Sequence, residues 1–236
     1  MITTEETSSL HDAMRRLWAD HVIWTRQYIV DAVAGARDAQ AAAERLLKNQ
    51  EDIANAFVPF YGEEMGGCLT DLLKSQVLIA VELVNAGIVD DERQFRREER
   101  HWNDKAAEIA ALLSEANPCW PEKDVQDLLS QELSFTKREF VARFEEDWEC
   151  DIQYFDDMFS QILTMADVLS EGLVSQFPDR FDHPGSRQAG GNGITAAGEG
   201  TASRLAEETI SPEQVHRMIQ SRYGAFAETG GHLEPC

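Results

Sequence analysis

Apolar residues recur at steps of three and four along most of residues 8–177, the spacing of amphipathic helices that bury one face. Breaks at Gly35, Pro59 and Gly62, Gly87, Pro118 and Pro178 separate the apolar stretches from one another. This pattern predicts helices over residues 8–33, 38–57, 63–87, 90–113, 121–143 and 148–177, the first of them capped by Thr7 or Ser8. No segment alternates with the period of two that a strand requires. The predicted fold class is therefore all-α, an antiparallel helical bundle of about six helices.

The composition changes after Pro178. Residues 182–203 are rich in glycine and have few large apolar side chains, which predicts a flexible linker. Beyond it, Ser211 and Pro212 open a short predicted helix that ends near Phe226. We therefore divide the chain into a helical bundle (1–181), a Gly-rich linker (182–203) and a short helical tail (204–236).

Three polar residues interrupt the predicted apolar faces. His21 lies in the stripe with Trp18 and Trp24, Gln76 interrupts the leucine-rich face of the third helix, and Glu132 does so in the fifth. If these faces meet, an imidazole, an amide and a carboxylate converge in the interior. Buried polar groups need partners, so this convergence predicts either a hydrogen-bond network or a site.

The candidate site is built on that convergence. Histidine with a carboxylate is a usual ligand pair for first-row transition metals, so His21 and Glu132 are the candidate metal ligands. Gln76 is a weak ligand that can orient a bound group, and Asn103 of the fourth helix can reach the same interior. Trp24 offers an aromatic wall for a pocket beside His21. The alternative is a purely structural network in which His21 donates to Glu132.

Other carboxylates are weaker candidates. The ExxH spacing of di-iron bundles occurs at Glu98–His101, predicted on the Arg-rich outer face, and at Glu213–His216 in the tail, so a di-iron centre is not favoured. Asp151, Asp156 and Asp157 flank the apolar stripe of the sixth helix and are expected at its solvated border. No GxSxG, phosphate-binding loop or HExxH motif is present, which disfavours an enzyme.

The net charge of the chain limits the classes of partner that it is expected to bind. There are 43 acidic and 21 basic residues, a formal net charge of −22. Such a surface repels nucleic acids and anionic membranes and favours cations or a basic protein partner. The polar, acidic start of the chain does not look like a signal peptide, and the four cysteines show no CxxC spacing. These features predict a cytoplasmic protein without a disulfide framework.

Four segments carry a resemblance: LWADHVIWTRQYI, NQEDIANAFVPFYGEE, ANPCW and ILTMADVLSEGLVSQFPDRF. They resemble a set of uncharacterised bacterial all-helical bundle proteins, over about residues 8–181. The resemblance implies a helical bundle and a bacterial source, with no activity to transfer. It also implies an interior of three histidines in those proteins, of which this chain keeps His21 and replaces two by Gln76 and Glu132.

Two functional hypotheses follow. The first is a soluble binding protein whose interior polar cluster takes a metal ion or a small polar ligand. The second is an interaction or regulatory module, in which the cluster only fixes packing while the acidic surface and the tethered tail engage a basic partner. The oligomeric state is not predicted.

Overall fold

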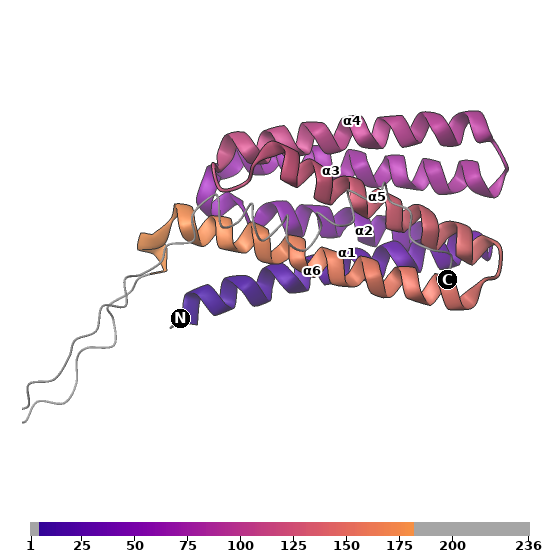
Figure 1. The fold of residues 1–236 in the computed structure, drawn as a ribbon, viewed down its shortest axis with the longest axis horizontal. Helices are drawn as coiled ribbons and strands as arrows, with labels where there is room; N and C mark the ends of the chain where they lie inside the picture. The colour runs from indigo at the N-terminus through magenta and orange to yellow at the C-terminus, as the bar shows by residue number, and fades with distance from the viewer. Residues whose placement is uncertain (1–4, 182–236) are drawn as a thin grey trace, which may run out of the picture.

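A computed structural model describes residues 5–181, and these residues form an all-α bundle (Figure 1). Within them there are six α-helices, one short 3₁₀ helix and no strand. The helices are α1 (Glu5–Val33), α2 (Ala39–Asn55), α3 (Val58–Ile88), α4 (Glu92–Ala116), α5 (Glu122–Phe144) and α6 (Trp148–Gln176), followed by η1 (Pro178–Arg180). The predicted fold class is thereby confirmed for this part of the chain. The predicted linker and tail helix lie outside the described residues.

The helices run up and down and form a closed ring. Each helix packs against the next one in the chain, and α6 returns to pack against α1. Figure 1 shows the helices nearly aligned along the long axis, with α4 on one side of the bundle and α1 and α6 on the opposite side. Short turns join antiparallel neighbours, as the sequence predicts. One end of the bundle therefore carries the turns α1–α2, α3–α4 and α5–α6.

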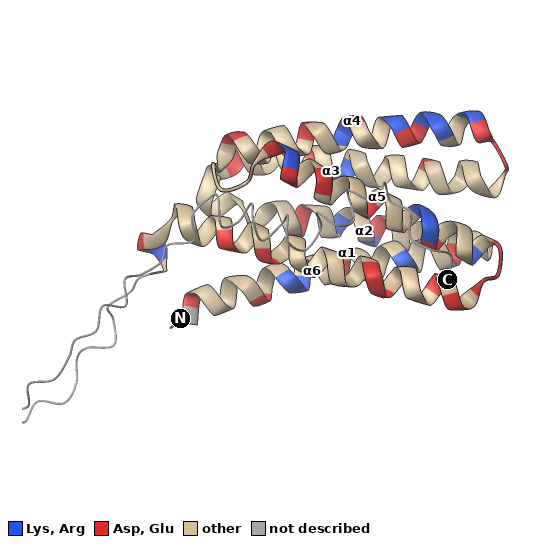
Figure 2. Cartoon of the chain, in the orientation of Figure 1, with Lys and Arg blue, Asp and Glu red and all other residues tan. Residues whose placement is uncertain are grey.

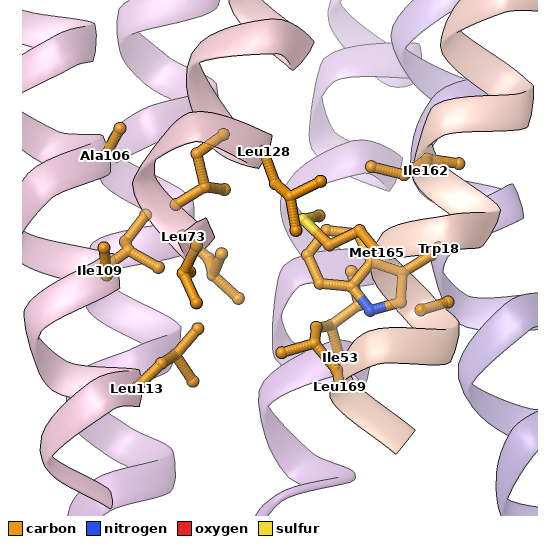
Figure 3. Packing of buried hydrophobic residues seen from close by; sticks show 14 of the residues in the cluster. Trp18, Ile53, Leu73, Ala106, Ile109, Leu113, Leu128, Ile162, Met165 and Leu169 are labelled. Atoms are coloured by element: carbon orange, nitrogen blue, oxygen red, sulfur yellow. The ribbon is translucent and has the colours of Figure 1, made fainter. Parts of the chain in front are cut away.

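The core fills the length of this ring. Its main cluster takes large side chains from every α-helix, including Trp18, Ile53, Leu73, Ile109 and Leu128, and Figure 3 shows them meeting between the helices. Burial of apolar surface of this kind is the dominant stabilising term in folding. None of the described helices has an apolar stretch suited to spanning a bilayer.

The local sequence explains where the helices break and restart. Gly62 has φ 84°, so it interrupts α3 near its start, and a turn of helix over residues 58–61 precedes the main helix that was predicted from residue 63. Asp91 and Asp147 cap α4 and α6 by accepting hydrogen bonds from the backbone N–H of Gln94 and Cys150. The predicted cap at Thr7 or Ser8 is wrong, because α1 already includes both residues.

Candidate functional site

His21, Gln76 and Glu132 line one small interior cavity, so the three polar interruptions of the sequence pattern do converge. The space open to the centre of a water molecule is about 20 Å³, above the 10–15 Å³ that one water needs. Five helices, α1 to α5, contribute to the wall. The lining residues are Trp18, His21, Thr25, Leu46, Gln50, Leu73, Gln76, Val77, Ala80, Trp102, Leu129 and Glu132.

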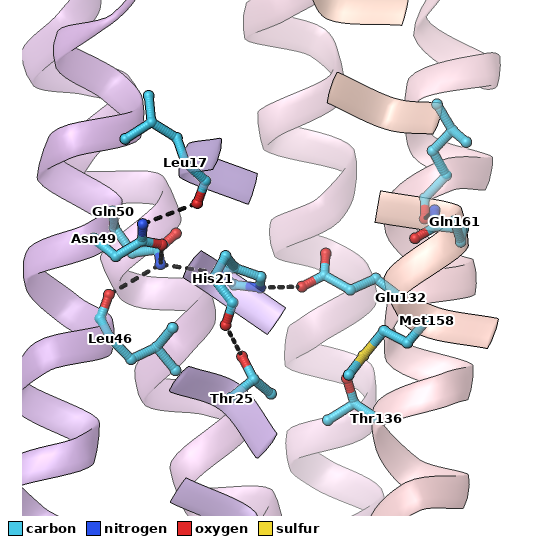
Figure 4. A network of polar contacts seen from close by, with 11 residues as sticks. Leu17, His21, Thr25, Leu46, Asn49, Gln50, Glu132, Thr136, Met158 and Gln161 are labelled. Carbon is cyan, nitrogen blue, oxygen red and sulfur yellow. Dashed lines mark hydrogen bonds and ion pairs between the residues drawn. The ribbon is translucent and has the colours of Figure 1, made fainter. Parts of the chain in front are cut away.

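His21 is held on both ring nitrogens (Figure 4). Its Nε2 lies 2.7 Å from Glu132 Oε1, and its Nδ1 lies 3.0 Å from Gln50 Nε2. The same amide nitrogen lies 3.0 Å from the carbonyl oxygen of Leu46, which identifies it as the donor. Nδ1 therefore accepts a hydrogen bond, and Nε2 carries the proton that is donated to Glu132. The imidazole is neutral in this arrangement and faces a carboxylate acceptor.

Part of the support for His21 comes from α2, a helix with no residue in the predicted site. Gln50 and Asn49 are both fully buried, and Asn49 Nδ2 donates to the carbonyl oxygen of Leu17, one helical turn before His21. Thr25 Oγ1 donates to the carbonyl oxygen of His21 itself. A signal was present, since Gln50 lies four residues after Leu46 and three before Ile53 in the apolar stripe.

Three polar atoms of residues that line the cavity have no partner. Gln76 Oε1 is a buried acceptor, whereas Trp18 Nε1 and Trp102 Nε1 are buried donors, and none of the three makes a hydrogen bond within the described residues. Leaving a buried polar group unsatisfied costs about 1–3 kcal/mol, so such groups are usually paired with protein, water or a ligand. Trp102 was predicted in the apolar seam of α4, without a role in the site.

Two predicted contributors lie away from the cavity. Asn103 is exposed, and its Nδ2 donates to the carbonyl oxygen of Glu99 on its own helix. Trp102, the residue before it, occupies the inward position, and adjacent helical positions face different directions. Trp24 packs with the smaller apolar cluster around Tyr28 and Phe140, and the Arg45 guanidinium lies 5.4 Å from its ring centroid. Neither residue lines this cavity.

Two acidic residues are buried where the sequence predicted exposure. Glu98 is buried and accepts hydrogen bonds from Arg97 and His101, so only His101 of this ExxH pair lies on the outer face. Asp151 is 1% exposed and does not border the solvent. Asp151 Oδ2 lies 2.9 Å from Arg26 Nη2 and 3.3 Å from Arg143 Nη1. These two ion pairs offset the cost of burying the carboxylate.

Arg26 also pairs with a second buried carboxylate, that of Glu139. Its Nη1 lies 2.6 Å from Glu139 Oε1, while Glu139 Oε2 is buried without a partner. Burial raises the pKa of Glu139 to about 7, although the positive charge of Arg26 opposes the shift. Glu139 follows Glu132 by seven residues on α5, so two polar layers lie two turns apart on one helix.

The cavity offers few metal ligands. In the described part of the chain no group of three or more His, Cys, Asp or Glu side chains is placed to hold a metal ion. At the cavity the donors are His21 Nε2, the Glu132 carboxylate and the weak amide oxygen of Gln76. A metal ion there would displace the proton that Nε2 shares with Glu132.

Searches of protein-family models, curated proteins and solved structures return no match to this chain. The family resemblance therefore stays a prediction.

Proposed function

We propose that this chain is a binding protein whose interior cavity takes a small polar ligand. The observation that carries the proposal is the unpartnered Oε1 of Gln76, buried beside the hydrogen-bonded His21–Glu132 pair. Trp102 Nε1 and Trp18 Nε1 add two unpartnered donors among the same lining residues. A ligand that both donates and accepts hydrogen bonds would satisfy Gln76 and an indole N–H at once.

The size of the cavity limits this ligand. A volume of about 20 Å³ for the centre of a water molecule accommodates one water or one polar group of similar size. An amide, hydroxyl or amino group meets this limit and can donate to Gln76 Oε1. An amide or hydroxyl oxygen can also accept from Trp102 Nε1. The aromatic and aliphatic wall suits a short apolar remainder, as in most small-molecule sites.

A metal ion held by His21 and Glu132 is the second candidate, favoured by the ligand types, because an imidazole nitrogen and a carboxylate oxygen meet in the cavity wall. The hydrogen bond from Gln50 to Nδ1 weighs against it, because that bond leaves the proton on Nε2. A cytoplasmic location remains part of this proposal and rests on the sequence.

The indole N–H resonances of the full chain test the proposal. Selective loss in Trp102→Phe assigns the Trp102 signal, and acetamide, methanol, ammonium chloride and zinc chloride are then titrated in turn. We expect a saturable shift of the Trp102 signal with acetamide or methanol. Gln76→Leu should abolish this shift, because it removes the buried acceptor at nearly constant volume.

Gln161→Leu is the matched control. Gln161 is also a buried glutamine with an unpartnered Oε1, but it belongs to α6 and does not line the cavity. The shift should persist in this variant. A shift with zinc alone that disappears in His21→Ala replaces the proposal by the metal site. No saturable shift with any of the four probes refutes the binding function.

A further inference from the structure

The tip of the α5–α6 hairpin exposes an unusual concentration of large apolar side chains. Seven large hydrophobic residues are exposed in the described chain, and four of them belong to this hairpin. Val141 and Phe144 lie three residues apart on α5, and Trp148 and Ile152 lie four apart on α6. These spacings put each pair on one face of its helix. We call Val141, Phe144, Trp148 and Ile152 the hairpin patch.

The two aromatic residues of the hairpin patch contact neighbouring side chains. The guanidinium of Arg143 lies 4.7 Å from the centroid of the Trp148 ring, and the Phe144 ring lies 5.9 Å from that of Phe140, which belongs to the core. Trp148 and Phe144 nevertheless remain about half exposed, at 50% and 48%. Exposed aromatic residues gathered in this way typically mark interaction surfaces.

Acidic side chains lie next to the patch at the turn of the hairpin. Glu145, Glu146, Asp147 and Glu149 are all exposed and occupy the turn and the first residues of α6. Figure 2 shows this turn as an acidic connection at the end of the bundle. The cap formed by Asp147 and the helix dipole explain the carboxylates of the α6 N-terminus, but not the apolar residues between them. An occupant that is apolar on one side and basic at its margins would complement both features.

One segment of the chain has this chemistry. In a protein with 43 acidic residues among 236, residues 214–227 (QVHRMIQSRYGAFA) contain none. Val215, Met218, Ile219 and Tyr223 follow helical spacing, and His216, Arg217 and Arg222 supply the basic groups. We propose that residues 214–227 dock on the hairpin patch of the same molecule.

The connection is long enough for this contact. The bundle ends at Phe181, at the opposite end of α6 from Trp148, and the 29 residues of α6 span about 43 Å. Residues 182–213 can span about 100 Å when extended, more than twice this length. Because the segment is tethered, its effective concentration at the patch exceeds that of a free partner of similar affinity. The described bundle and the cavity do not depend on this contact.

Hydroxyl-radical footprinting of the full chain tests the docking, because it measures the oxidation rate of individual side chains. Met218→Asp with Ile219→Asp should release the segment and raise the oxidation rates of Trp148 and Phe144 roughly threefold, as expected if most molecules are docked. Arg217→Glu with Arg222→Glu should act in the same direction through repulsion from the acidic turn, and about 0.5 M NaCl should do so by screening the attraction. Leu78, an exposed residue of α3, should keep its rate throughout.

Ile210→Asp is the matched control, since it changes an apolar residue of the tail outside residues 214–227. It should leave the rate of Trp148 unchanged. Equal rates in the wild-type chain and both double variants refute the docking. Protection that weakens on dilution of the protein also contradicts it, because a second copy would then be the occupant.

Discussion

At the scale of single residues, the two buried carboxylates of α5 lie in different surroundings. Glu132 accepts a hydrogen bond from the neutral His21, whereas Glu139 faces the cation of Arg26 and keeps one oxygen without a partner. Burial is the largest influence on Glu139 and raises its pKa from 4.5 to about 7. The folded protein therefore binds a proton at Glu139 more tightly than the unfolded chain does.

Because the folded protein binds this proton more tightly, its free energy of unfolding depends on pH. A raised pKa in the folded state contributes stability that is complete below the unfolded value near 4.5 and is lost as the pH rises through about 7. We expect Glu139→Gln to remove this dependence, because an amide does not titrate. Between pH 4.5 and pH 8, the unfolding free energy of the wild type should fall relative to that of the variant by on the order of 3 kcal/mol. Urea unfolding at several pH values measures the difference.

The matched control for this titration is Glu149→Gln at an exposed position of α6. It should leave the shape of the wild-type pH dependence unchanged. If Glu139→Gln and the wild type remain parallel across this range, Glu139 is ionised throughout and the raised pKa is wrong.

The residues that the sequence could reveal are those that break an apolar stripe. His21, Gln76 and Glu132 were found in this way, since periodicity alone places them inward. Asp151 could not be found, because it is buried only through Arg26 and Arg143 of other helices, and such pairing is a tertiary feature. Asn103 was misplaced because Trp102 takes the inward position beside it.

At the scale of elements, the helices were predictable from apolar periodicity and helix-breaking residues. The close approach of two elements could not be predicted in this way. Gly172 of α6 illustrates this. Trp120, fully buried before α5, donates from Nε1 to the carbonyl oxygen of Val168 and lies directly against Gly172. A Cβ added at Gly172 would lie 2.0 Å from Trp120 Nε1. The sequence alone shows only a glycine that interrupts a helical pattern.

Gly172→Ala should therefore destabilise the protein, although alanine favours helix more than glycine does. Overpacking against the rigid indole is expected to cost about 1–3 kcal/mol. The gain in helix propensity, at most about 1 kcal/mol, does not offset it. Thermal and urea unfolding of the variant measure the net effect.

Gly67→Ala in α3 supplies the opposite control. Gly67 is helical and exposed, and an added Cβ meets nothing within 4 Å. This substitution should stabilise the protein by about 0.5–1 kcal/mol through helix propensity alone. Equal effects of the two substitutions would contradict the close packing of Trp120 on α6.

At the scale of the whole molecule, the ring of helices closes where α6 returns to α1, and two arginines of α1 cross this seam. Arg15 pairs with Asp167 through two hydrogen bonds of 2.6 and 2.7 Å, and its side chain is half exposed. Arg26 pairs with the buried carboxylates of Asp151 and Glu139. The two contacts have similar geometry but differ in burial, so they should differ in energy.

Arg26→Leu should destabilise the bundle by about 3–5 kcal/mol at pH 8, because it leaves buried carboxylates with one cation fewer. Arg15→Leu, the exposed counterpart on the same seam, should cost less than about 1 kcal/mol. The cost of Arg26→Leu should shrink towards pH 5, where Glu139 takes up its proton and one of the two buried charges disappears. Urea unfolding at both pH values measures these costs. Equal costs for the two substitutions at pH 8, or a cost of Arg26→Leu that does not change with pH, would show that the buried charges do not hold this seam. Closure of the ring would then depend on apolar packing between α1 and α6 alone.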